Sequence, residues 1–312
     1  MAGARRRKSP LIARFQPAPA LHPGDPVAVI APASGFERAA FDAGAALVAG
    51  RYRLSYGAGL FERHRYLAGS DARRLAELTA AFADPASRAV FCARGGYGAT
   101  RLLPALLGVA ATGSKPLVGF SDITALHLWL QRQGRISIHG PVLTQLAKLP
   151  PATLQRLFAL LESSEPAAAL SGTDCYVGGS AEGPLLGGNL SVFSRMLGTA
   201  FMPPLQGAVL LLEDQGERPY RLDRMWTHLR LAGVFAQVRG VVLGEFLGCE
   251  EAGAPYSSAE LLRELAQEAG VPCAAGFPVG HGAANEPLPL GARVRLEADS
   301  ARLSFLEPAV SA

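Results

Sequence analysis

The sequence predicts an α/β protein with two domains: an N-terminal α/β domain on a parallel sheet and a C-terminal mixed α/β domain. The chain has 312 residues, enough for two domains that each bury a core. In the first half, short and continuously apolar runs alternate with helical patterns, as in parallel sheets covered on both faces. In the second half short strand-like runs are more frequent, and some are expected to pair in antiparallel fashion.

The N-terminal domain is expected over residues 21–160. Its first strand, at 27–31, follows the turn Pro23-Gly24-Asp25. Ser70 and Asp71 mark the start of a helix whose apolar residues recur at helical spacing, and Pro85 closes it. Further strands are expected at 89–93, 117–119 and 136–139, with one helix after Ser121 and a short one at 154–161.

A change of composition predicts the domain boundary. Residues 161–182 are rich in Gly, Ser and Ala and are interpreted as a linker, which leaves 183–312 for the C-terminal domain. In that domain, strands are expected at 208–212, 241–243, 294–296 and 303–305, and helices at 190–197, 221–231 and 258–269. Residues 1–20 are expected to form a basic, flexible leader.

Charge and hydropathy exclude several classes of function. The net charge of +4 owes much to Arg5-Arg6-Arg7-Lys8 in the leader, and no basic stripe with interleaved aromatic residues predicts a nucleic-acid partner. No apolar run approaches the ~18 residues of a membrane span, and the leader lacks the apolar core of a secretory signal. We therefore expect neither a nucleic-acid nor a membrane partner, and a cytoplasmic location.

Cysteine and histidine usage gives no sign of a disulfide framework or a metal site. The four cysteines are scattered without a CxxC pair, which favours reduced thiols in a cytosolic protein. No HExxH motif or His/Cys cluster has the spacing of metal ligands, and no GxGxxG or Walker motif predicts a nucleotide. The sequence therefore predicts no metal and no cofactor.

Ser121 is the candidate nucleophile. It lies in Gly119-Phe120-Ser121-Asp122, where a short buried strand runs into a helical pattern. A strand–turn–helix corner lifts the middle side chain above the sheet edge and directs free helix amides toward it. The alternative interpretation is that Ser121 or Asp122 only caps the helix, and it is the more common role for such residues.

His281 is the favoured general base, because a histidine between two glycines in a loop after a strand has no packing role to explain it. His127 lies six residues beyond Ser121 on the same helix, about 240° around its axis, and therefore faces away. His139 ends a strand beside Gly140-Pro141 and is expected to line the cleft.

Glu213 is the candidate acid that orients the base, because it ends a nearly all-apolar strand. Asp214 and Glu217 remain alternatives, although a helix cap or an exposed turn suits them better. The order Ser…Glu…His is that of α/β-hydrolases, but Ile123 stands where the GxSxG signature has its last glycine. The amide of Asp122 and the loop 94–98 could supply two donors to an oxyanion.

Together these segments resemble the LD-carboxypeptidases, the cytoplasmic murein tetrapeptide carboxypeptidases, and the related microcin-immunity peptidases. The segments that carry the resemblance are VAVIAPAS (27–34), RYLAG (65–69), RGGYGATRLLP (94–104), GFSDITALH (119–127), IHGP (138–141), EGPLLGGNLSVF (182–193), LLLEDQGERPYRLDRM (210–225) and GHGAANEPLPLG (280–291). They span most of the chain in the family's order.

The resemblance implies a nucleophile at Ser121, an acid at Glu213, a base at His281, and oxyanion amides at Gly96 and Asp122. It also implies two α/β domains with the active site between them, no metal, and a homodimer. The implied reaction is hydrolysis of the bond between an L-centre of diaminopimelate and a terminal D-alanine. Without the resemblance, the identity and spacing of the residues predict a serine hydrolase but not its substrate.

Recognition of the substrate is the least determined part of the prediction. Arg94, just before the glycine turn, is the candidate for binding the free carboxylate, and pairing with a neighbouring acid is an equally good interpretation. Gly95, His139 and Asn189 complete the candidate substrate-binding set. The expected partner is a small peptide or muropeptide, and the alternatives are an aminoacyl-nucleotide antibiotic as substrate or a non-catalytic, two-lobed peptide-binding protein.

Overall fold

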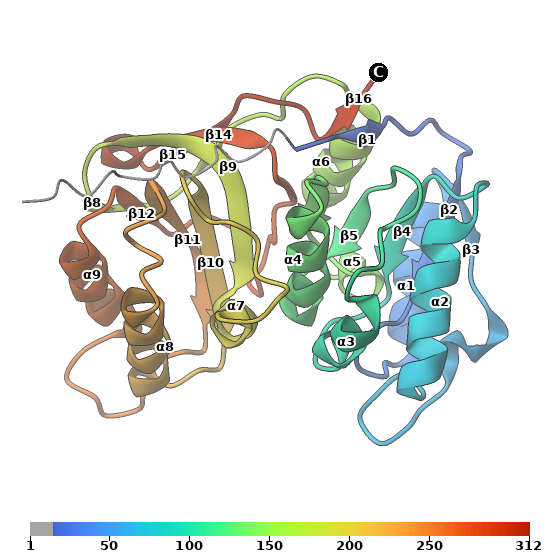
Figure 1. Ribbon diagram of the computed structural model, residues 1–312, viewed down its shortest axis with the longest axis horizontal. Helices are drawn as coiled ribbons and strands as arrows, with labels where there is room; N and C mark the ends of the chain where they lie inside the picture. The colour runs from blue at the N-terminus through green and yellow to red at the C-terminus, as the bar shows by residue number, and fades with distance from the viewer. Residues whose placement is uncertain (1–14) are drawn as a thin grey trace, which may run out of the picture.

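The structure, a computed structural model, describes residues 15–312 and contains two large sheets side by side (Figure 1). The N-terminal sheet has the strand order β13-β6-β5-β4-β2-β3. Its strands are β2 (Pro26–Ile30), β3 (Arg53–Ser55), β4 (Ala89–Cys92), β5 (Leu117–Gly119), β6 (Ser137–His139) and β13 (Leu288–Leu290). All pairs are parallel except β13 with β6.

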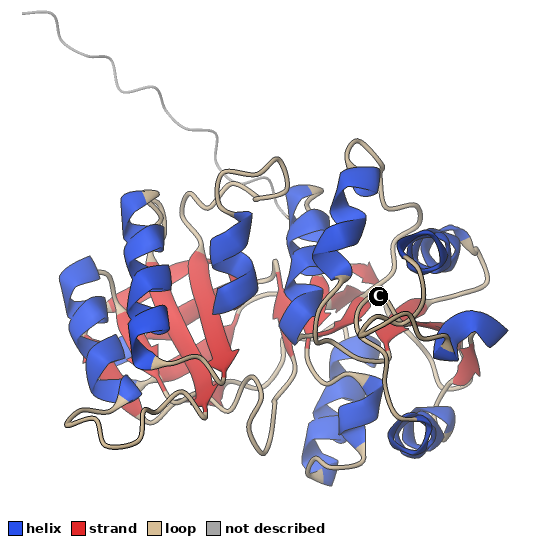
Figure 2. Cartoon of the chain, turned by 90° about the horizontal axis from the view of Figure 1, so that it is seen from below, coloured by secondary structure: helices blue, strands red, loops and turns tan. Residues whose placement is uncertain are grey.

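Helices cover both faces of this sheet (Figure 2). They are α1 (Arg38–Ala49), α2 (Asp71–Ala83), α3 (Leu103–Leu106), α4 (Thr124–Arg132), α5 (Leu143–Leu146) and α6 (Pro151–Glu162), with the 3-10 turns η1 (Ala58–Phe61), η2 (Ala99–Leu102) and η3 (Ser121–Ile123). The Ser70 hydroxyl accepts a hydrogen bond from the Arg73 amide, so α2 begins where the sequence predicts. Double coverage explains why strands such as β4 are apolar without alternation.

The C-terminal sheet is mixed, with the order β7-β15-β14-β9-β10-β11-β12-β8. Its strands are β7 (Leu170–Ser171), β8 (Asp174–Val177), β9 (Ser180–Asn189), β10 (Val209–Gln215), β11 (Gly240–Leu247), β12 (Cys273–Ala275), β14 (Arg293–Glu297) and β15 (Arg302–Phe305). The helical segments of this half are α7 (Leu190–Met196), α8 (Pro219–Leu231), α9 (Ser258–Ala269) and the turn η4 (Ala298–Ser300). The predicted fold class, a parallel-sheet domain followed by a mixed one, is confirmed.

The predicted linker and leader are shorter than the sequence suggested. Residues 170–182 hold β7, β8 and the start of β9, because small and polar residues suffice for strands near a sheet's edge. Phe15 is buried, and β1 (Ala18–Pro19) pairs with β16 (Val310–Ser311), so residues 15–20 belong to the folded chain. The rest of the predicted leader lies outside the described residues.

Helix α4 lies between the two sheets and joins their cores (Figure 1). It contacts β6 on one side and β9 and α7 on the other, and eight of its nine residues are buried. The two halves therefore share one interior, and the loops at the carboxyl ends of β4, β5 and β10 meet beside it. Within residues 15–312, every helix is too short or too polar to span a bilayer.

Candidate active site

Ser121 occupies a tight corner between β5 and α4. Its backbone φ is +64°, a left-handed conformation that is uncommon for residues other than glycine. Phe120, just before it, is extended, and the Phe120 carbonyl accepts from the Ile123 amide. Such strain persists only where surrounding structure imposes it, and here it raises the serine side chain out of the sheet edge.

Three side chains from separate segments form one hydrogen-bonded chain. His281 Nε2 lies 3.1 Å from Ser121 Oγ, and His281 Nδ1 lies 2.7 Å from Glu213 Oε2. Ser121 follows β5, Glu213 is in β10, and His281 lies in the loop between β12 and β13. Because an ionised carboxylate only accepts, Nδ1 carries the proton and Nε2 is free to accept from the serine hydroxyl.

The surroundings of Glu213 and His281 determine the pKa values of their side chains. Glu213 is fully buried, and burial raises the pKa of its carboxyl above the ordinary value, although His281 opposes the shift. Burial lowers the pKa of His281, but the hydrogen bond and charge of Glu213 outweigh it, so the net shift is upward. Gly280 permits this approach, since a Cβ there would lie 2.7 Å from Glu213 Oε2.

The glycine-rich loop after β4 lies directly against Ser121. A Cβ on Gly95 would lie 2.9 Å from Ser121 Cβ, and Gly96 has a φ of +95°. Asp122 is buried, and its Oδ2 accepts from the Ala99 amide at 2.7 Å, which ties the serine corner to the end of this loop. Burial raises the pKa of the Asp122 carboxyl to about 6.

A cavity of about 690 Å³ opens above the serine. Gly96, Ser121, Asp122, Asn189 and His281 all line it, so the structure gathers five of the sequence-predicted site residues in one place. Asn189 also caps α7 by accepting from the Val192 amide, and its Nδ2 donates to Asp214 Oδ1. The far wall includes Arg195 and Glu217.

Three of the four predicted substrate-binding residues do not line this cavity. Arg94 is exposed and donates to the Gly35 carbonyl at 3.1 Å. His139 is fully buried beside the Phe120 ring, because β13 covers the outer edge of β6, and its ring nitrogens have no hydrogen-bond partner among residues 15–312. His127 contacts Ser137 Oγ and the Gly119 carbonyl and does not contact the Ser121 side chain, in keeping with the prediction that it faces away. Gly95 backs Ser121 instead of facing the cavity.

Sequence reasoning missed Arg195 and Ser34. Arg195 has no ion pair within residues 15–312, and only its place on α7, the short helix that Asn189 caps, could have suggested a role. Ser34 lies in the quoted VAVIAPAS segment, and a Cβ on Gly96 would lie 2.4 Å from its Oγ. Among the same residues, no group of three or more His, Cys, Asp or Glu side chains is arranged to hold a metal ion.

Comparison with known proteins identifies the family. The models described as LD-carboxypeptidase N-terminal domain and LD-carboxypeptidase C-terminal domain match residues 27–140 and 182–296. A murein tetrapeptide carboxypeptidase of Pseudomonas aeruginosa is 37% identical over 256 residues, which cover 77% of this chain and 82% of that protein. The chain belongs to the LD-carboxypeptidase family. It is therefore a hydrolase with carboxypeptidase activity.

Solved structures of the LD-carboxypeptidase fold agree with the architecture. A muramoyltetrapeptide carboxypeptidase from Oxalobacter formigenes is 27% identical, with a TM-score of 0.82 over 92% of this chain and all of the other. MccF in complex with glutamyl sulfamoyl guanosine has a TM-score of 0.84 over 95% of this chain and 99% of the other. At 22% identity, the likeness to MccF concerns the fold alone.

Proposed function

We propose that this protein is a serine L,D-carboxypeptidase that removes the terminal D-alanine from murein tetrapeptides during cell-wall recycling. The observation that carries the proposal is the hydrogen-bonded chain Ser121–His281–Glu213 at the wall of a cavity large enough for a small peptide. The names of the murein carboxypeptidase from P. aeruginosa and the muramoyltetrapeptide carboxypeptidase from O. formigenes support this substrate class. The cytoplasmic location and the homodimer stay predictions.

The first half-reaction forms an acyl-enzyme. Ser121 Oγ attacks the carbonyl carbon of the scissile bond while its proton passes to His281 Nε2. Glu213 holds the imidazole in the reactive tautomer and stabilises the imidazolium. When the tetrahedral intermediate collapses, the C–N bond breaks, and His281 returns the proton to the amine of the departing D-alanine.

The second half-reaction regenerates the serine. Water attacks the ester carbonyl with His281 as base, the bond to Ser121 Oγ breaks, and the shortened peptide leaves as a carboxylate. In both halves negative charge develops on the carbonyl oxygen, where the amides of Gly96 and Asp122 would donate hydrogen bonds. No step requires a metal.

The direct test is turnover of defined substrates by the purified chain. Incubation with murein tetrapeptide should release D-alanine and tripeptide, whereas an aminoacyl sulfamoyl adenosine should remain intact. Hydrolysis of the second compound alone would replace the proposed substrate with an aminoacyl-nucleotide. If the chain binds tetrapeptide, releases no D-alanine and leaves the aminoacyl sulfamoyl adenosine intact, neither peptidase activity is supported.

We further propose that Arg195 binds the free carboxylate of the substrate. A carboxypeptidase must distinguish a terminal carboxylate from an internal amide, and a guanidinium can do so through two parallel N–H bonds. Arg195 lines the cavity, donates one N–H to the Ser191 carbonyl and has no ion pair among residues 15–312. Arg94, the sequence-based candidate, is bound to Gly35 and does not line it.

Arg195→Lys should raise KM for tetrapeptide about tenfold with a smaller effect on kcat, because the charge stays while the paired N–H bonds are lost. On a substrate whose terminal D-alanine is amidated, wild type and variant should perform alike. Arg94→Lys is the matched control, and steady-state kinetics of both variants on both substrates make the comparison. If the carboxylate-dependent loss appears in Arg94→Lys instead, Arg94 has the role assigned here to Arg195.

A further inference from the structure

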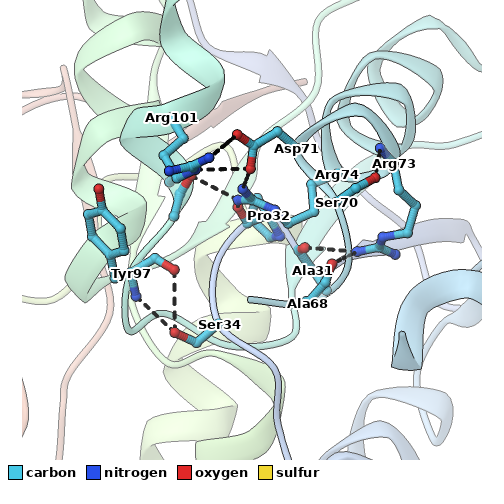
Figure 3. Close-up of polar contacts among 12 residues, drawn as sticks. Ala31, Pro32, Ser34, Ala68, Ser70, Asp71, Arg73, Arg74, Tyr97 and Arg101 are labelled. Atoms are coloured by element: carbon cyan, nitrogen blue, oxygen red, sulfur yellow. Dashed lines mark hydrogen bonds and ion pairs between the residues drawn. The ribbon is translucent and has the colours of Figure 1, made fainter. Parts of the chain in front are cut away.

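A fully buried arginine, Arg74, lies beneath the loop that borders the serine. It comes from α2, does not line the cavity, and none of its side chain is exposed. Figure 3 shows its guanidinium among backbone and carboxylate oxygens from three segments. A buried charge is costly unless it is paired and hydrogen-bonded, so these contacts account for its position.

The guanidinium joins two neighbouring loops through their carbonyls. Arg74 Nη1 donates to the carbonyl of Pro32, just after β2, and to that of Gly98 at 2.8 Å, in the loop after β4. Strands β2 and β4 are adjacent and parallel, so both loops leave the same edge of the sheet. Gly98 has a φ of +135°, and a Cβ there would lie 2.7 Å from Arg74 Nη1. Only glycine permits this contact.

One carboxylate neutralises the arginine and links it to the next turn. Arg74 Nη2 donates to Asp71 Oδ1, and Arg101 of η2 pairs with the same carboxylate, with Nη2 2.6 Å from Oδ2 (Figure 3). Asp71 is in the first turn of α2, where the helix dipole favours a negative charge. Two residues of α2 therefore contact this region: Arg74 binds the Gly98 carbonyl, and Asp71 binds the side chain of Arg101.

The loop 95–98 is held in place by hydrogen bonds from residues outside it. Residues 95, 96 and 98 are glycines, which leave the backbone conformationally free. Ser34 Oγ accepts from the Tyr97 amide at 3.0 Å (Figure 3). The Ser34 amide donates to the Gly95 carbonyl at 3.2 Å. Ser34 therefore holds the residues on both sides of Gly96, and Arg74 holds the loop at Gly98, two residues after Gly96.

We propose that Arg74 is a positioning residue for the oxyanion site. Because Arg74 binds the carbonyls of both Gly98 and Pro32, it fixes the position of the loop relative to the sheet. The position of the loop in turn sets the direction of the Gly96 N–H. Ser34 fixes the same segment at Gly95 and at Tyr97. The proposal rests on the proposed serine mechanism, because the amide of Gly96 matters only if an oxyanion forms on a Ser121 adduct.

Arg74→Lys tests the proposal against Arg73→Lys. A lysine keeps the charge but lacks the planar fork that reaches two carbonyls and a carboxylate together. Arg73 is the matched control, since it lies on the same helix and also donates hydrogen bonds to backbone carbonyls. Its three carbonyl acceptors belong to Gly59, Ala31 and Ala68. None of these is in the loop 95–98.

Two readouts separate positioning from general stability. With tetrapeptide, Arg74→Lys should lower kcat about 10- to 100-fold and leave KM nearly unchanged, because the oxyanion interaction strengthens only in the transition state. With a fluorophosphonate, Ser121 Oγ forms a bond to phosphorus, fluoride leaves, and the proton goes to His281. The rate of this labelling, followed by intact mass, should fall by a similar factor, and Arg73→Lys should label at about the wild-type rate.

Equal labelling rates for Arg74→Lys and Arg73→Lys in folded proteins would overturn the proposal. If Arg74→Lys does not fold, Ser34→Ala decides, because it removes the other anchor from a partly exposed position. Slower labelling of folded Ser34→Ala supports the anchored loop, and a wild-type rate rejects it. A wild-type protein that is never labelled at Ser121 would reject the serine mechanism itself, which is a different failure.

Discussion

Ser121→Ala is expected to fold like the wild-type chain and to lose at least ~10³-fold in kcat on murein tetrapeptide. The hydroxyl that lies 3.1 Å from His281 Nε2 is then missing, and no acyl-enzyme can form. The measurement is release of D-alanine under single-turnover and steady-state conditions, with the melting temperature as the check on folding.

Ser121→Gly is the matched control for this variant. Alanine inherits the strained φ of +64°, whereas glycine adopts that conformation without steric cost. Both variants should be inactive, and the glycine variant should melt at the higher temperature. Turnover near the wild-type rate in folded Ser121→Ala would remove Ser121 from the mechanism.

Glu213→Gln is expected to have a comparably large effect, a loss of kcat on the order of 10³- to 10⁴-fold. Glutamine has the same shape, but its amide can present an N–H to His281 Nδ1 and so favour the wrong tautomer. Glu217→Gln should cost much less, because Glu217 contacts Ser191 and Arg221 at the cavity wall and not the base. The reverse ranking of the two variants would show that Glu217 is the orienting acid.

The same variant should change the pH dependence of the reaction. His281 must be neutral to accept the serine proton, and its pKa is raised, so kcat/KM should rise with pH through an apparent pKa above 6.5. Without the charge of Glu213, burial is the largest remaining influence on the imidazole and lowers its pKa, although the charges of Asp214 and Glu245 still oppose it. In Glu213→Gln the acid limb of the residual activity should therefore move to lower pH. An unmoved limb would mean that a different group titrates.

The sequence predicted the strands and helices well where one local rule dominates. The apolar run at 89–93 and the Ser70 cap produced β4 and the start of α2 at the expected places. Ser121, Glu213 and His281 could be named because each ends or follows a strand-like run, which is where α/β proteins place ligand-binding groups. That Ser121 and Glu213 come from two different sheets, after β5 and in β10, is visible only in the structure.

Long-range packing accounts for what the sequence did not indicate. His139 ends a strand, which suggested a cleft residue, but β13 arrives from 149 residues later and covers it. The role of Arg74 could not be predicted either, since its partners Pro32 and Gly98 are 42 and 24 residues away. No local pattern marks a side chain whose partners are carbonyls of distant loops.

The pairing of β13 with β6 also bears on when activity can first appear during synthesis. The serine leaves the ribosome 160 residues before the histidine that would activate it, a delay on the order of 10 s. Throughout that interval the edge of β6 lacks the strand that later covers it, and the nascent half has a nucleophile without a base. The segment that closes this edge follows directly after the His281 loop. If the proposed mechanism holds, hydrolytic competence and protection of the exposed edge are thus acquired in the same late step.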